Sequence, residues 1–211
     1  MKIFRGLERC VLSQGFGKEN TSKKMLPYYQ SKGLQGHNGW DWAFIGKTQD
    51  LYYDVSDKGK VLRVDNDIAG GIGLEIVSFD RTFYWKHRYW HLEQGSIPVQ
   101  AGDEIVKGQF IGVCDNTGYS TGPHLHRDMK RCDVNGYTID RNNGYFGCVD
   151  MAPYFQNIYV RDLVDTPKPP ITPEPKPMPK DPITVEEKKS ILIKIVEALK
   201  RLIYLKSRKK K

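Results

Sequence analysis

Hydrophobic and polar residues follow a β-strand pattern from residue 11 to about residue 155. Short apolar or alternating runs are separated by Gly, Asn and Asp, which favour turns. No long helical period precedes residue 183. We therefore expect an all-β domain of antiparallel strands. The predicted strands are residues 40–45, 59–64, 73–78, 81–90, 110–114 and 124–129, and turn signals stand at 65–67, 135–136 and 143–144.

The pattern changes near residue 165, and two further segments follow. Residues 165–182 hold eight of the twelve prolines and almost no core-forming side chain, so we expect a Pro-rich extended linker. Residues 183–211 begin with a capping box at Thr184 and Glu187, and their apolar residues recur at helical spacing. We expect a C-terminal amphipathic α-helix whose apolar stripe meets either another copy of the chain, as a homo-oligomer, or a membrane surface.

The net charge of +8 is concentrated in this tail. Residues 1–164 hold 20 Lys or Arg against 19 Asp or Glu, whereas residues 183–211 hold ten against three. A nucleic-acid-binding domain needs positive charge clustered on its folded body. Because residues 1–164 are nearly neutral, we do not expect nucleic acid as a partner.

The cysteines are placed too far apart for a metal knot. Cys10, Cys114, Cys132 and Cys148 include no Cys-x-x-Cys pair, which argues against a four-cysteine zinc site. Cys132 and Cys148 flank a turn-rich segment, so they either form a disulfide bridge or remain thiols. We favour thiols, and the bridge stays open as the alternative.

All five histidines lie between residues 37 and 126, and four side chains form two short motifs. His37 and Asp41 make a His-x-x-x-Asp motif, and His124 and His126 make a His-x-His motif. Residues two apart on a strand face the same side, so His124 and His126 can point into one cleft. Two imidazoles and one carboxylate make a zinc site whose fourth position takes water, which suits hydrolysis of a peptide bond.

Together these motifs resemble those of the lysostaphin-type zinc metalloendopeptidases. The resemblance runs from about residue 12 to residue 155, and its order and spacing agree throughout. It implies a duplicated-hybrid-motif-like fold, with antiparallel sheets arranged as a sandwich or half-barrel with a groove. The matching stretches are residues 13–17, 36–41, 89–92, 102–112, 116–126 and 149–155, with one residue of slack in the fourth.

The resemblance also implies the roles of the site residues. His37, Asp41 and His126 would hold Zn²⁺, while His91 and His124 would orient the attacking water and stabilise the oxyanion. Of these two, His124 is the better candidate for the general base, and His91 fits the oxyanion role. The implied substrates are peptide bonds of bacterial peptidoglycan, in the stem peptide or the cross-bridge.

Two stretches depart from the family pattern. Arg127 and Asp128 stand where the family usually has an aromatic residue and a glutamate, and residues 130–148 form a longer excursion than usual. Both changes bear on the groove wall and on substrate choice. Among the remaining aromatic residues, Tyr28 and Tyr29 are candidates to line the cleft, and His87 has no assigned role.

The domain organisation expected from the sequence is a zinc metalloendopeptidase domain at 1–164, a linker at 165–182 and a basic helix at 183–211. The first residues lack the apolar stretch of about 7 to 15 residues that a secretion signal needs. We expect action on the cell wall outside the cytoplasm, after release by lysis, as by a phage endolysin, or from a virion. Two other hypotheses are an inactive module that binds wall peptides or regulates a partner, and a structural protein of a virion or surface assembly.

Overall fold

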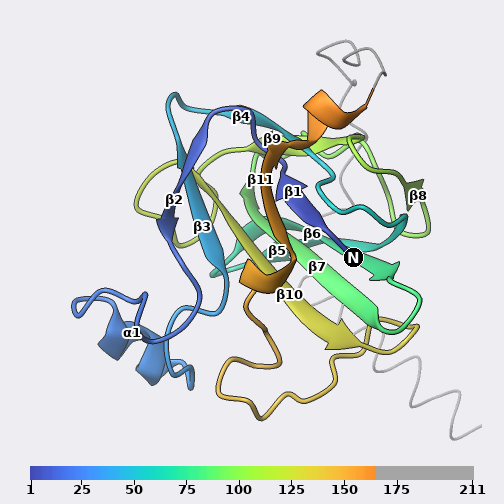
Figure 1. The fold of residues 1–211 in the computed structure, drawn as a ribbon. Helices are drawn as coiled ribbons and strands as arrows, with labels where there is room; N and C mark the ends of the chain where they lie inside the picture. Colours follow the sequence, from blue (N-terminus) through green and yellow to red (C-terminus); the bar gives the residue numbers. More distant parts are fainter. Residues whose placement is uncertain (165–211) are drawn as a thin grey trace, which may run out of the picture. The chain divides into compact units, whose positions relative to one another are not determined.

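The computed structural model describes residues 1–164. The predicted linker at 165–182 and the predicted helix at 183–211 therefore lie outside the described residues. Within residues 1–164 the chain is mostly β-structure, as expected, with one short α-helix and two 3₁₀ turns (Figure 1). No helix in this part of the chain is long and apolar enough to cross a membrane.

Nine strands form one antiparallel sheet in which the main path runs β2-β3-β10-β7-β6-β5-β8. Strand β9 joins this path through β7 and also pairs with β4. A second, two-stranded sheet pairs β1 with β11 in parallel, which departs from the expected all-antiparallel arrangement. The strands are β1 (Ile3–Arg5), β2 (Cys10–Gln14), β3 (Trp40–Phe44), β4 (Gln49–Tyr52), β5 (Gly59–Asp67), β6 (Gly71–Phe79), β7 (Tyr84–Leu92), β8 (Glu104–Ile105), β9 (Phe110–Cys114), β10 (His124–Cys132) and β11 (Phe155–Tyr159).

The six predicted strands are all present, with shifted ends. The prediction of a turn at 65–67 is wrong, because β5 continues through Asp67, whose carboxylate accepts hydrogen bonds from the backbone of Ala69 and Gly70 in the turn that follows. The strand predicted at 81–90 begins at Tyr84 instead. Arg81 has a φ of 76° and belongs to the preceding turn.

Short elements escaped the sequence pattern. Five strands of five residues or fewer were not predicted, namely β1, β2, β4, β8 and β11. The side chains of β2, for example, are exposed or half-buried along the edge of the sheet. The helix α1 (Leu26–Ser31) has only six residues and precedes β3. The 3₁₀ turns are η1 (Ala152–Tyr154) and η2 (Val160–Leu163).

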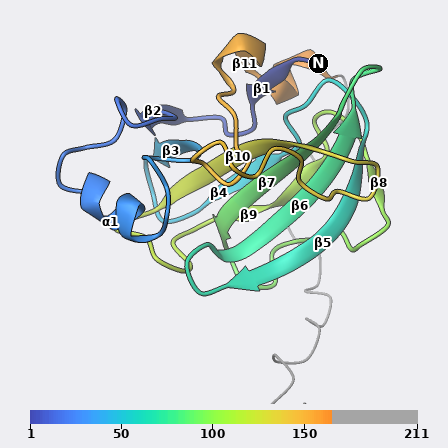
Figure 2. The ribbon, with the colours of Figure 1, turned by 90° about the horizontal axis from the view of Figure 1, so that it is seen from below.

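The centre of the large sheet is well packed. In β6 every residue from Gly71 to Ser78 is buried, and Leu74 and Ile76 are fully inaccessible to solvent. Figure 2 shows β5, β6 and β7 side by side as a curved sheet, with β10 and β3 continuing it toward α1. Part of the candidate site lies on this continuation, where Asp41 projects from β3 and His126 from β10.

Candidate metal centre and active site

Asp41 and His126 meet across two neighbouring strands. They are direct partners in the register of β3 and β10, so their side chains share one face of the sheet. Nδ1 of His126 lies 2.8 Å from Oδ1 of Asp41. The pairing of the strands therefore brings together two side chains 85 residues apart in the sequence.

His37 completes the cluster from the segment just before β3. Its Nε2 lies 3.2 Å from Oδ1 of Asp41 and 3.1 Å from Nδ1 of His126. Atoms bound to one tetrahedral zinc ion at about 2.0–2.1 Å lie roughly 3.3 Å from one another. The donor set and the spacing of His37, Asp41 and His126 thus fit a single Zn²⁺ ion.

Backbone contacts aim the ring of His37 at this cluster. Its Nδ1 donates to the carbonyl of Gly15 at 2.8 Å, which turns Nε2 toward Asp41 and His126. The glycine-containing stretch at 13–17, singled out in the sequence, thereby contacts the site through its backbone. Gly39 is needed for a different reason, since a Cβ there would lie 2.8 Å from Nε2 of the His126 ring.

The charges of the cluster support one another. Burial by itself would raise the pKa of Asp41, but hydrogen bonds from His126 and His37 outweigh burial and lower it. Burial would lower the pKa of His126, but the neighbouring carboxylates of Asp128 and Asp41 raise it to about 9. Without a cation, the cluster therefore holds a proton that a metal ion would replace.

His91 and His124 form a second pair of imidazoles beside the cluster. Their ring centroids are 4.4 Å apart, and Nε2 of His124 lies 3.7 Å from Oδ1 of Asp41. Nδ1 of His91 donates to the carbonyl of Thr117 at 2.7 Å, and Nδ1 of His124 donates to that of Gly122 at 2.8 Å. In both rings Nε2 is therefore the nitrogen that can contact water or a substrate.

His91 adopts an unusual backbone conformation. Its φ is 65°, a region that side-chain-bearing residues seldom occupy, and such strain is often found at functional sites. Its backbone N–H donates to Gly70 and its carbonyl accepts from Asp115, so both neighbouring loops hold it. Burial, aided by the charge of His124, lowers the pKa of His91 to about 4. The ring is neutral at pH 7.

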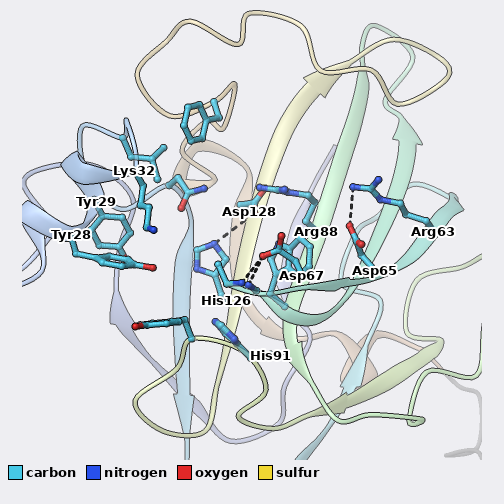
Figure 3. A pocket seen from close by; sticks show the side chains of 17 residues that line it. Tyr28, Tyr29, Lys32, Arg63, Asp65, Asp67, Arg88, His91, His126 and Asp128 are labelled. Atoms are coloured by element: carbon cyan, nitrogen blue, oxygen red, sulfur yellow. Dashed lines mark hydrogen bonds and ion pairs between the residues drawn. The ribbon is translucent and has the colours of Figure 1, made fainter. Parts of the chain in front are cut away.

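A groove of about 520 Å³ leads to these side chains. Figure 3 shows Tyr28, Tyr29 and Lys32 on one side of it and Arg63 with Asp65 on the other. Tyr28 stacks on Tyr119 with ring centroids 6.0 Å apart, which links α1 to the loop at 115–123. His91, His126 and Asp128 belong to the groove lining.

The structure brings together all five side chains singled out as site residues and leaves His87 apart. His87 is fully buried, and its Nε2 contacts Oγ of Ser78 at 2.8 Å, so it belongs to the core. Tyr28 and Tyr29 line the groove, as expected. Cys132 and Cys148 are free thiols in the structure.

Four polar groups of the site were not predicted from the sequence. They are the carbonyls of Gly15, Thr117 and Gly122 and the carboxylate of Asp128. Backbone carbonyls leave no residue-type signal. The sequence did carry a signal for Asp128, because residues 124, 126 and 128 alternate along a strand and share a face.

Residues 35–141 match the family model described as peptidase family M23, which is more than half of the 211 residues. The β-fold and the cluster of two histidines and one aspartate therefore place the protein in the class of metallopeptidase-like proteins. The chain belongs to peptidase family M23, and the resemblance inferred from its motifs is confirmed.

The relatives include two curated endopeptidases. Glycyl-glycine endopeptidase ALE-1 of Staphylococcus capitis is 33% identical over 95 residues, covering 44% of this chain and 25% of the relative. Peptidoglycan DD-endopeptidase ShyA of Vibrio cholerae is 33% identical over 99 residues, covering 47% and 21%. The match therefore spans a quarter or less of the length of these relatives.

Solved structures agree with this fold. A zinc-containing peptidase from Vibrio cholerae is 25% identical with a TM-score of 0.50, covering 66% of this chain and 39% of that one. The solution structure of lysostaphin has the same TM-score at 21% identity, covering 76% and 57%, which is a likeness of fold.

Proposed function

We propose that residues 1–164 form a zinc-dependent endopeptidase that hydrolyses peptide bonds in bacterial peptidoglycan. The observation that carries this proposal is the convergence of His37, Asp41 and His126, whose candidate ligand atoms all lie within 4.8 Å of one another. Two further imidazoles stand beside them. Membership of the family and the activities for which the relatives are named support the same function.

His37, Asp41 and His126 would hold the zinc ion. When bound, the ion supplies a Lewis acid that lowers the pKa of water and polarises the scissile carbonyl. The pairing of β3 and β10 holds Asp41 and His126 in place, so two of the three ligands need little reordering when a metal ion binds.

His124 is the proposed general base. Its Nδ1 is engaged by the carbonyl of Gly122, so Nε2 can take the proton that the attacking water loses. His91 presents Nε2 beside it and is neutral at pH 7, so it orients the water as an acceptor. Because Nδ1–H is engaged by Thr117, donation to an oxyanion would need a second proton on this ring, at Nε2.

Metal removal and one substitution test the proposal. Purified chain should cleave peptidoglycan peptides, lose activity with a chelator and regain it with zinc. His124→Ala should lower the rate by about 10²–10⁴-fold. His87→Gln is the matched control, since it alters a buried histidine outside the cluster. Full activity of His124→Ala, or indifference to the chelator, would contradict the proposal, and turnover by the native chain would exclude an inactive binding module.

The identity of the peptide bond that is cleaved needs a second experiment. The two relatives are named for different bonds, a glycyl-glycine bond and a DD-peptide bond. We propose a peptide of the stem or the cross-bridge as the substrate. Digestion of defined peptidoglycan fragments, followed by identification of the new termini, distinguishes the two.

The remaining expectations stay predictions. They are action outside the cytoplasm, phage or virion origin, and a contact made by the helix at 183–211. Deletion of residues 183–211 should reduce an oligomer to a monomer if the tail self-associates. If the shortened and the full chain have the same number of subunits in solution, the tail does not self-associate. The other hypothesis is then binding to a membrane surface, which flotation with anionic vesicles measures.

A further inference from the structure

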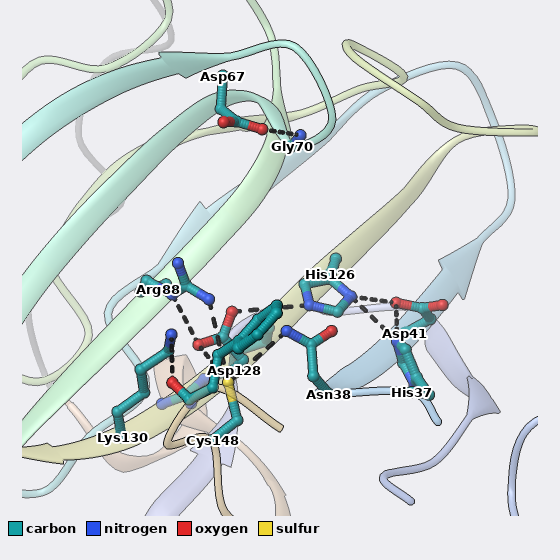
Figure 4. A network of polar contacts seen from close by, with 12 residues as sticks. His37, Asn38, Asp41, Asp67, Gly70, Arg88, His126, Asp128, Lys130 and Cys148 are labelled. Atoms are coloured by element: carbon teal, nitrogen blue, oxygen red, sulfur yellow. Dashed lines mark hydrogen bonds and ion pairs between the residues drawn. The ribbon is translucent and has the colours of Figure 1, made fainter. Parts of the chain in front are cut away.

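We propose that Asp128 is a positioning residue for His126, and that Arg88 holds Asp128 in place for this task. The inference rests on the proposed metal site, though not on the identity of the peptide cleaved. Asp128 follows His126 by two residues on β10, so both side chains project from the same face of the sheet. Figure 4 shows the carboxylate between the imidazole of His126 and the guanidinium of Arg88.

One oxygen of Asp128 is already engaged. Nε of Arg88 donates to Oδ1 at 2.7 Å, and Arg88 is the direct partner of Asp128 in the register of β7 and β10. The thiol of Cys148 also contacts Oδ1 at 3.6 Å. Arg88 is itself held, since its guanidinium lies over the ring of Trp90 at 5.4 Å. The carboxylate therefore cannot turn freely.

The other oxygen faces the metal ligand. Oδ2 of Asp128 lies 3.6 Å from Nε2 of His126, the ring nitrogen that points away from Asp41. It is buried and has no hydrogen-bond partner within residues 1–164. Leaving a buried carboxylate oxygen unpaired is unfavourable. A shift of about 0.4–0.9 Å would bring the pair into hydrogen-bonding distance.

A hydrogen bond from Nε2–H of His126 to Asp128 has a definite consequence. It places the ring proton on Nε2, which leaves the lone pair of Nδ1 for the metal ion. It also orients the ring and makes it a stronger ligand, as carboxylates behind metal-bound histidines do. The contacts with Arg88 and Cys148 hold the carboxylate of Asp128 on this strand.

Zinc affinity separates this role from a merely structural one. In Asp128→Asn the carbonyl oxygen can still accept from Arg88, but the amide then presents a donor to His126. The dissociation constant of the metal-free full chain for zinc, measured by competition with a chelating dye, should rise about 10–100-fold. Asp128→Glu should restore part of the loss.

Glu75→Gln is the matched control. Glu75 is another buried carboxylate, 3.9 Å from NH1 of Arg88, and it lies one strand further from His126 on β6. It should change stability and leave zinc affinity within about twofold of the native value. Equal loss of affinity in both variants, or no loss in Asp128→Asn, overturns the proposal.

A measurement on the native chain covers the case in which Asp128→Asn fails to fold. Long-range ¹H–¹⁵N spectra of the zinc-loaded protein should show the proton of His126 on Nε2, shifted downfield and slow to exchange because a carboxylate accepts it. A proton on Nδ1, or an Nε2–H that exchanges as fast as an unbonded imidazole N–H, overturns the proposal. Native chain that binds zinc with a hydrogen-bonded Nε2–H but cleaves no peptide would contradict the proposed function and leave the role of Asp128 standing.

Discussion

Arg127 and Asp54 form a two-point ion pair inside the domain. Nε of Arg127 lies 2.7 Å from Oδ2 of Asp54, and its terminal nitrogen lies 2.9 Å from Oδ1. Tyr89 donates to the same carboxylate at 2.6 Å. Arg127 is adjacent to His126 on β10, so it projects from the opposite face of the strand. The strand that carries a candidate metal ligand is thus anchored from behind.

Loss of this ion pair should destabilise the fold. Asp54→Ala leaves the charged guanidinium of Arg127 buried without a carboxylate, so the free energy of unfolding should fall by about 3–5 kcal/mol in urea denaturation. Asp65→Ala is the control, because its partner Arg63 is 57% exposed and such pairs contribute about 1 kcal/mol or less. A smaller loss in Asp54→Ala than in the control would contradict this account.

Zinc binding should depend steeply on pH. The pKa of His126 in the metal-free protein is raised to about 9, so below that pH the metal must displace a proton from the ring. The apparent affinity should increase about tenfold per unit between about pH 6 and pH 8. Calorimetry in buffers of different ionisation enthalpy measures the proton released. A flat affinity over this range would show that His126 binds no proton there.

The metal-free fold should weaken in mild acid. The pKa of His91 is lowered to about 4, below the value of about 6.5 in an unfolded chain, so the unfolded state binds the proton first. The stability contribution is complete above about pH 6.5 and is lost as the pH falls toward 4. Between about pH 7 and pH 5, His91→Asn should reduce the pH-dependent loss by about 1–2 kcal/mol. Thermal unfolding with a chelator tests this, and equal slopes for both proteins would refute it.

The histidines should separate into two classes on substitution. His37→Gln removes a candidate ligand and should abolish stoichiometric zinc binding. His87→Gln removes the contact of a fully buried ring with Ser78, so it should cost about 1–3 kcal/mol of stability and leave the stoichiometry unchanged. Metal analysis after gel filtration, together with urea unfolding, measures both. Loss of zinc from His87→Gln without loss of fold would reassign that residue.

The cysteines should react as one accessible and three protected thiols. Cys10 is half-buried, whereas Cys114, Cys132 and Cys148 are buried. Burial, with the charge of Asp128, raises the pKa of Cys148 to about 12, which slows its reaction further. A disulfide reagent should modify one thiol quickly in the native chain and four after denaturation. Only two in the denatured, unreduced chain would reveal a bridge.

The sequence by itself determined the all-β class, six strands and the candidate chemistry. These features are local, because strand alternation and the spacings of His37 to Asp41 and of His124 to His126 span a few residues. Membership of the family followed from the same motifs. Short elements such as α1 and β2 have too few residues for a period to emerge, so they were not predicted.

Tertiary structure decided which atoms of these residues meet. The register of β3 and β10 pairs Asp41 with His126, and register depends on contacts along the whole sheet. Likewise, the partner of Arg127 is Asp54, 73 residues away. The nitrogen that each histidine presents is set by a backbone carbonyl or by Asp128, and no residue type in the sequence reveals such a neighbour until the chain has folded.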